Sequence, residues 1–206
     1  MGIINGSMTI TRLRVLEPEL HEGWRDLYRD RLDEHAFRAP PQGLGKEEVE
    51  GWCQVHNLLD TEFGDYNQWL YTDWAVFALR VDKKNLPAKL AKAMLEKRCQ
   101  EWAAELGLER CPASRRSELK DQLDDELLAK TLPSVKVTEV AWHLTSGWVI
   151  VHSLSEGAVE RVRKRFHRTF GKRLAPWSPL DWLEDDGAVD ALLGKGPSLV
   201  TRGGTE

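Results

Sequence analysis

A run of basic residues near the C-terminal end of the chain has the composition best suited to binding chemistry. The run extends from Arg161 to Arg173 and holds no Asp or Glu but seven Lys or Arg residues: Arg161, Arg163, Lys164, Arg165, Arg168, Lys172 and Arg173. The formal net charge of the chain is -4, so this run is a local concentration of positive charge. Such a patch suits a polyanion, for example the phosphate backbone of nucleic acid. The alternative is a solvated helix face whose charges are offset by acidic neighbours in the fold.

Two further basic residues, Arg115 and Arg116, lie at the predicted start of another helix. The amino end of a helix carries a partial positive charge, which favours anions. These two arginines are therefore additional candidates for phosphate contacts.

Histidine and cysteine give no pattern typical of a metal site. None of the six His residues forms a pair with another His or a Cys at ligand spacing. The histidines are scattered singly along the chain, at His21, His35, His56, His143, His152 and His167. The sequence also lacks the glycine-rich loops that bind nucleotides and the G-x-S-x-G motif of a nucleophile elbow. We expect neither a metal nor a cofactor.

Acidic residues suggest the main alternative, a metal-dependent DNA exonuclease. Such an enzyme needs two or more carboxylates that converge on magnesium. The candidates form two sets: Asp124, Asp125 and Glu126 on a predicted helix, and Asp181, Glu184, Asp185 and Asp186 after the basic run. Consecutive helix positions point in different directions, and an acidic segment next to a basic helix commonly screens it. The sequence therefore favours a non-catalytic protein over a nuclease.

Trp177 and Trp182 follow the basic run and could stack the bases of single-stranded nucleic acid beside it. Structural tryptophan is the commoner explanation, because each indole buries a large apolar area.

The basic run is predicted to lie on an amphipathic helix that starts near Ser155. Val159, Val162, Phe166 and Phe170 recur every three or four residues, so they share one face and should pack inward. Arg161, Lys164, Arg165 and Arg168 would then face outward, and the positive surface would be a property of the helix.

The rest of the chain alternates helical and strand patterns in the order of an α+β fold. Alternation and helical spacing predict a strand over 9–16, a helix over 19–34, a loop over 39–45, strands over 49–55 and 68–81, helices over 87–106 and from 114, a hairpin over 135–144 and 148–151, and a last strand over 172–175. Trp74, Val76 and Phe77 should enter the core, residues 82–85 should form a turn, and Ser114 should cap its helix. We expect antiparallel or mixed sheet segments, two long central helices and a basic C-terminal helix.

This order divides the chain into three parts, with an N-terminal β-α-β-β part over 1–84, the helical pair, hairpin and basic helix over 85–176, and a C-terminal segment over 177–206. Gly194 to Glu206 is expected to be disordered. No apolar run is long enough to span a bilayer and no signal peptide is present, so we expect a cytoplasmic protein without membrane contacts. Cys53, Cys99 and Cys111 are odd in number, which predicts reduced, mostly buried thiols.

The order of these features resembles the recombination-associated protein RdgC family of bacteria, over roughly residues 9 to 175. The similar features are a Leu-Pro-Ala helix start at 86–88, a Glu-Leu-Lys run at 118–120 that leads to Glu-Leu-Leu at 126–128, a strand with Trp142, a glycine turn, and the helix from Ser155. The segments His35 to Arg38 and Gly51-Trp52 also resemble the amino end of that family.

The resemblance implies an α+β protein that dimerises into a ring and binds double- and single-stranded DNA without marked sequence preference. It implies a nucleoid-associated protein that restrains recombinase-driven strand exchange, and some members are labelled putative exonucleases. This chain is considerably shorter than the best-known members, so whether its ring closes stays open.

A third hypothesis is a protein-interaction module in which the basic helix meets an acidic partner.

Overall fold

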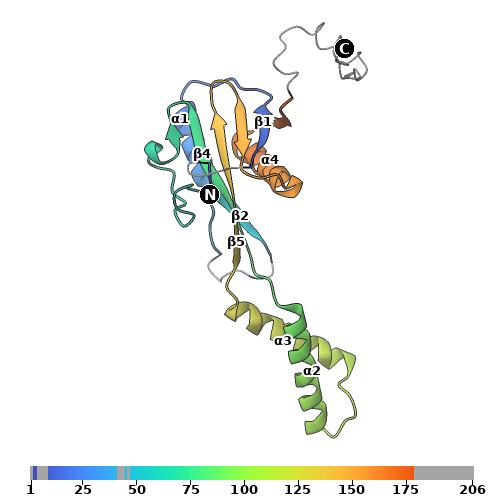
Figure 1. Ribbon diagram of the computed structural model, residues 1–206. Helices are drawn as coiled ribbons and strands as arrows, with labels where there is room; N and C mark the ends of the chain where they lie inside the picture. The colour runs from blue at the N-terminus through green and yellow to red at the C-terminus, as the bar shows by residue number, and fades with distance from the viewer. Residues whose placement is uncertain (1, 4–8, 41–44, 46, 179–206) are drawn as a thin grey trace, which may run out of the picture.

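The fold is known from a computed structural model that describes residues 2–3, 9–40, 45 and 47–178. Within these residues the chain forms one seven-stranded sheet, four α-helices and a short 3-10 helix (Figure 1). The elements are β1 (Thr11–Val15), α1 (Trp24–Glu34), β2 (Val49–Cys53), η1 (Tyr66–Gln68), β3 (Leu70–Tyr71), β4 (Trp74–Lys83), α2 (Ala88–Glu105), α3 (Ala113–Lys130), β5 (Ser134–His143), β6 (Trp148–Val151), α4 (Glu156–Phe170) and β7 (Leu174–Pro176). The predicted α+β class is confirmed.

The sheet is antiparallel throughout its named strands. Its order is β2-β4-β5-β6-β1-β7, with β3 paired to β4 beside this path. β4 and β5 form the longest ladder, from Trp74 opposite His143 to Lys83 opposite Ser134. The ladder begins in the body of the sheet and ends where α2 and α3 branch off, so it connects the two parts of the molecule (Figure 1).

Helices α1 and α4 cover the same face of the sheet. Tyr28 of α1 contacts Trp142 of β5 at 5.1 Å between ring centroids, and Phe166 of α4 contacts the same indole at 5.0 Å. These side chains belong to one buried cluster with the inward residues of β1, β4 and β6. Alternate residues of a strand point to opposite faces, so the other face of the sheet is turned away from both helices.

Helices α2 and α3 form a hairpin that projects beyond the end of the β4–β5 ladder (Figure 1). Their contact is a small separate core of Leu95, Cys99, Leu119 and Leu123. The two helices predicted over 87–106 and from 114 are therefore confirmed, and their buried apolar residues pack mainly on each other.

Several local predictions were wrong for identifiable reasons. Helix α1 begins at Trp24 because Gly23 takes a left-handed conformation with φ of 74°. Trp74 lies on the face of β4 that is turned away from α1 and α4, and it is only partly buried. Asp82 does not form a turn, because it continues β4 and its buried carboxylate accepts hydrogen bonds from Arg80 at 2.6 and 2.8 Å. Ser114 does not cap α3, because the helix already begins at Ala113 and Pro112 occupies the capping position.

The sheet contains strands from both sides of residue 85, and the proposed boundaries at 84 and 176 stay predictions. The expected disorder of Gly194 to Glu206 and most of the segment after 177 lie outside the described residues. Cys53, Cys99 and Cys111 are free, and the first two are buried as predicted. None of the helices in the described part of the chain is long and apolar enough to cross a membrane.

Candidate nucleic-acid interface

The predicted inward face of α4 is confirmed. Val162 and Phe166 are fully buried, and Val159 and Phe170 pack at the edge of the same cluster. The helix ends at Gly171, whose φ of 70° is left-handed and whose backbone N–H donates to the carbonyl of His167 at 2.8 Å. This packing fixes the rotation of α4 and so decides where each basic side chain points.

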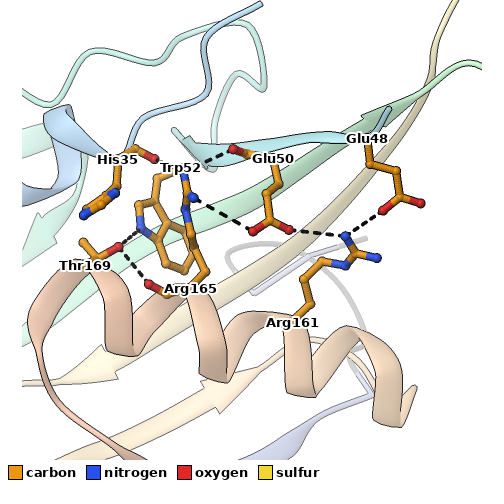
Figure 2. A network of polar contacts seen from close by, with 7 residues as sticks. All are labelled: His35, Glu48, Glu50, Trp52, Arg161, Arg165 and Thr169. Atoms are coloured by element: carbon orange, nitrogen blue, oxygen red, sulfur yellow. Dashed lines mark hydrogen bonds and ion pairs between the residues drawn. The ribbon is translucent and has the colours of Figure 1, made fainter. Parts of the chain in front are cut away.

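Arg165 points toward strand β2, although its spacing predicted an outward position. Its guanidinium donates to the backbone carbonyls of His35 at 3.0 Å and Glu50 at 3.1 Å (Figure 2). Burial lowers the pKa of Arg165, and burial together with the charge of Arg165 lowers the pKa of His35. Arg165 thus helps to hold α4 against β2.

Arg161 and Thr169 extend this contact along the helix. Arg161 donates to Glu48 at 2.8 Å and to Glu50 at 3.2 Å, while Thr169 accepts from the indole N–H of Trp52 at 2.8 Å (Figure 2). Hydrogen bonds from Lys83 and Arg161 lower the pKa of Glu48, so this carboxylate stays charged between them. Here the acidic-neighbour alternative describes the structure well.

Lys172 has little access to solvent. Only 9% of the residue is exposed, and its ammonium donates to the backbone carbonyls of Glu17 at 2.6 Å and Glu19 at 3.0 Å. These bonds connect the end of α4 to the segment that follows β1.

Three other cations of the run remain on the outside. The exposed fraction of the side chain is 71% for Lys164 and 68% for Arg173, and Arg168 is also exposed. Lys164 lies 3.9 Å from Glu160, and Arg173 lies 3.9 Å from Glu17. Exposed pairs of this kind contribute only about 0–1 kcal/mol, so a phosphate could replace either carboxylate at little cost.

Arg163 lies between these two groups. Its guanidinium donates to the backbone carbonyl of Leu174 at 3.0 Å and to Glu160 at 2.8 Å, and 39% of its side chain is exposed. One side of the guanidinium therefore anchors α4 to β7, while the other remains accessible.

Arg115 and Arg116 are far from this surface. They lie in the first turn of α3, on the hairpin that projects away from α4 (Figure 1). Arg115 pairs with Glu118 at 2.6 Å and lies 5.8 Å above the indole of Trp102. They cannot extend the surface formed by α4 within one chain.

Two lysines missed by sequence reasoning join the cations of α4. Lys83 of β4 and Lys136 of β5 line a groove of about 700 Å³ together with Arg161 and the start of α4. Val81 pairs with Lys136, so Lys83, two positions along β4, lies on the same face of the ladder. The register between strands more than 50 positions apart produces this meeting, and no local pattern indicates it.

The candidate nuclease carboxylates do not form a cluster in the described residues. Asp124, Asp125 and Glu126 occupy consecutive positions of α3, and Glu126 accepts from Arg98 at 2.6 and 3.1 Å. No group of three or more His, Cys, Asp or Glu side chains within 2–3, 9–40, 45 and 47–178 is arranged to hold a metal ion. The second set, Asp181, Glu184, Asp185 and Asp186, lies outside the described residues, as does Trp182.

The different environments of Lys172 and Lys164 give a direct stability prediction. Lys172→Met should lower the free energy of unfolding by about 1–3 kcal/mol, because the buried ammonium and its two hydrogen bonds to the backbone carbonyls of Glu17 and Glu19 are lost. The matched variant Lys164→Met should change it by less than about 0.5 kcal/mol, since its ammonium is exposed. Urea unfolding of both variants measures the difference, and equal stabilities would show that the carbonyl contacts of Lys172 do not hold α4.

Fold and site together define an α+β protein that presents a cationic helix on one face of an antiparallel sheet. The family model described as "Putative exonuclease, RdgC" matches residues 25–184, well over half of the chain. The chain belongs to the RdgC family, which confirms the resemblance seen in the sequence. No curated protein matches the chain.

Proposed function

We propose that this protein binds DNA through the phosphate backbone, without sequence preference, and acts in recombination or replication at the nucleoid. Membership of the RdgC family supports the choice of DNA as the partner. The observation that carries the proposal is the set of outward cations on and beside α4, Lys164, Arg168 and Arg173, which we call the outer cations.

The position of the cations matters more for DNA binding than the net charge of the chain. Nonspecific DNA binding requires Lys and Arg side chains that reach phosphates and release condensed counterions. The outer cations meet this requirement because all three are exposed and the ion pairs of Lys164 and Arg173 are weak. Arg161 and Arg163 are half-exposed and would add contacts, whereas Arg165 and Lys172 would act mainly by holding α4 in place.

The groove beside the start of α4 could extend the same track. Lys83, Lys136 and Arg161 line it, and Glu48 is the acidic side chain among its lining residues. A phosphate that displaced Glu48 from Lys83 and Arg161 would gain two charge-assisted contacts in place of that carboxylate.

We also propose that the protein acts as a homodimer or a larger homo-oligomer, with a ring that limits recombinase access to DNA. A ring would retain DNA topologically, so modest phosphate contacts would suffice. Light scattering gives the assembled mass, and a monomer that still binds DNA would refute the ring.

The test of backbone binding is charge reversal of the outer cations. Lys164→Glu, Arg168→Glu and Arg173→Glu in one chain should weaken binding to a short labelled duplex by about 10- to 100-fold at low salt. Fluorescence anisotropy with two unrelated duplexes of equal length should give the same loss for both, because phosphate contacts do not read sequence.

A matched control separates local contacts from net charge. The control variant changes three exposed lysines of α2 and α3 to Glu together: Lys89, Lys97 and Lys120. Its net charge then differs from that of the parent by the same amount as in the α4 variant. The hairpin variant should keep nearly the parental affinity. If it loses as much affinity as the α4 variant, the outer cations are not the binding surface.

The family description also keeps a nuclease among the candidate functions. End-labelled duplex incubated with magnesium or manganese would lose label if the chain degrades DNA. Asp124→Asn and Asp125→Asn would prevent this loss if the α3 carboxylates hold the metal, whereas the backbone-binding proposal alone expects intact label.

A further inference from the structure

The face of the sheet opposite α1 and α4 carries a group of tryptophan and arginine side chains. Arg12 and Arg14 of β1 alternate with Leu13 and Val15, which are buried under the helices, so both arginines belong to the other face. In the antiparallel register Arg14 pairs with Trp148.

The same face is hollowed between its aromatic residues. A cavity of about 360 Å³ lies against six side chains of this face and its rim, which we call the tryptophan face: Ile10, Arg12, Trp74, Trp148, Ile150 and Trp177. Within the described part of the chain, no acidic residue lines this cavity. The surface therefore combines aromatic area with positive charge, away from the cations of α4.

The indoles are held in a defined arrangement. Trp148 and Trp177 lie 6.1 Å apart between ring centroids with their planes tilted by 57°, so they do not stack face to face. Arg12 lies 5.6 Å from the centre of Trp177, within reach of a cation–π contact. Trp148 has 42% of its surface exposed, so part of its indole is accessible to a ligand on this face.

We propose that the tryptophan face binds the unpaired bases of single-stranded DNA by stacking, an inference that rests on the proposed DNA-binding function. Indoles stack any base regardless of sequence, and nearby guanidinium groups attract the phosphates that connect the bases. Open sheet faces that display aromatic side chains are suited to this mode, because neighbouring strands hold the rings in a fixed array.

The ligand must be single-stranded because a duplex hides the flat surfaces of its bases. On a sheet face a duplex could offer only its phosphates, on which the indoles cannot stack. The tryptophan face would therefore select unpaired strands, whereas the outer cations on the opposite side would accept either form of DNA.

The test compares two leucine variants with their phenylalanine counterparts. Trp148→Leu and Trp177→Leu should each weaken binding to a short oligothymidine by about 5- to 150-fold, the range typical of one stacked base. Trp148→Phe and Trp177→Phe keep an aromatic ring and should retain most of the affinity. Thermal unfolding of each variant verifies that the fold is intact.

Two further ligands make the result specific. An abasic strand of the same length should bind the parent protein and the leucine variants equally, because it offers phosphates without bases. Duplex affinity should also be unchanged in the leucine variants, since α4 lies on the other face. Loss of duplex binding in the outer-cation variant tests the proposed function separately.

The proposal is overturned if the leucine variants bind oligothymidine as tightly as the parent, or if the parent binds the abasic strand as tightly as oligothymidine. It is also overturned if the leucine variants lose assembled mass and bind both forms of DNA less tightly in parallel. That pattern would make the tryptophan face a contact between two copies of the chain.

Discussion

Replacing Phe166 with alanine is expected to lower the free energy of unfolding by about 3–5 kcal/mol, the usual cost of removing a buried aromatic ring. Phe166 is fully buried and contacts Trp142 at 5.0 Å and Phe170 at 4.7 Å between ring centroids. The loss follows from the cavity left between α4 and the sheet. Urea unfolding followed by circular dichroism measures it.

The control for this variant is Phe166→Leu, which keeps most of the apolar volume and should cost clearly less than alanine. Loss of duplex binding by Phe166→Ala should follow its loss of folded protein. A change of less than about 1 kcal/mol in the alanine variant would contradict the packing of α4 on the sheet.

Gly51→Ala is expected to destabilise the fold by about 3 kcal/mol or more, at the upper end of what overpacking costs. A Cβ at this position would lie 2.3 Å from Cα and 2.4 Å from the backbone N of Phe37. These are backbone atoms, so no side chain can rotate to make room. The strand and the segment beside it would have to separate, which would strain the hydrogen bonds from Phe37 N–H to Trp52 O and from Trp52 N–H to His35 O.

Gly157→Ala on α4 provides the opposite expectation. Among the described residues, no neighbouring atom lies within 4 Å of a Cβ added there, and alanine favours a helix over glycine by about 1 kcal/mol. Thermal unfolding should therefore show a lower midpoint for Gly51→Ala and an equal or higher one for Gly157→Ala. Equal midpoints for the two variants would contradict the close approach at Gly51.

The sequence predicted α4 well because its apolar residues follow a strict helical period. Val162 and Phe166 lie inward as expected, and Gly171 ends the helix. Which of the cations are exposed and which are held by the fold could not be predicted in the same way. Arg165 and Lys172 are held by backbone carbonyls of His35, Glu50, Glu17 and Glu19, which only the tertiary fold brings near them.

Long-range pairing also explains what the sequence could not reveal about the sheet. The segments around Ala36 and Trp52 both resemble the family, but their spacing does not indicate that they form a parallel bridge. Likewise, Lys83 and Lys136 meet because β4 and β5 pair across the inserted helical hairpin. The tryptophan face arises from β1, β4, β6 and the residue after β7, so no single stretch of sequence contains it.

The most direct test of the account is the salt dependence of duplex binding for Lys164→Ala, Arg168→Ala and Arg173→Ala combined. If the outer cations bind phosphates, the plot of log K against log salt should become shallower by about 0.9 for each phosphate that is no longer neutralised, or about 2.7 in total. A line parallel to that of the parent protein would contradict the claim that these three side chains bind the DNA backbone.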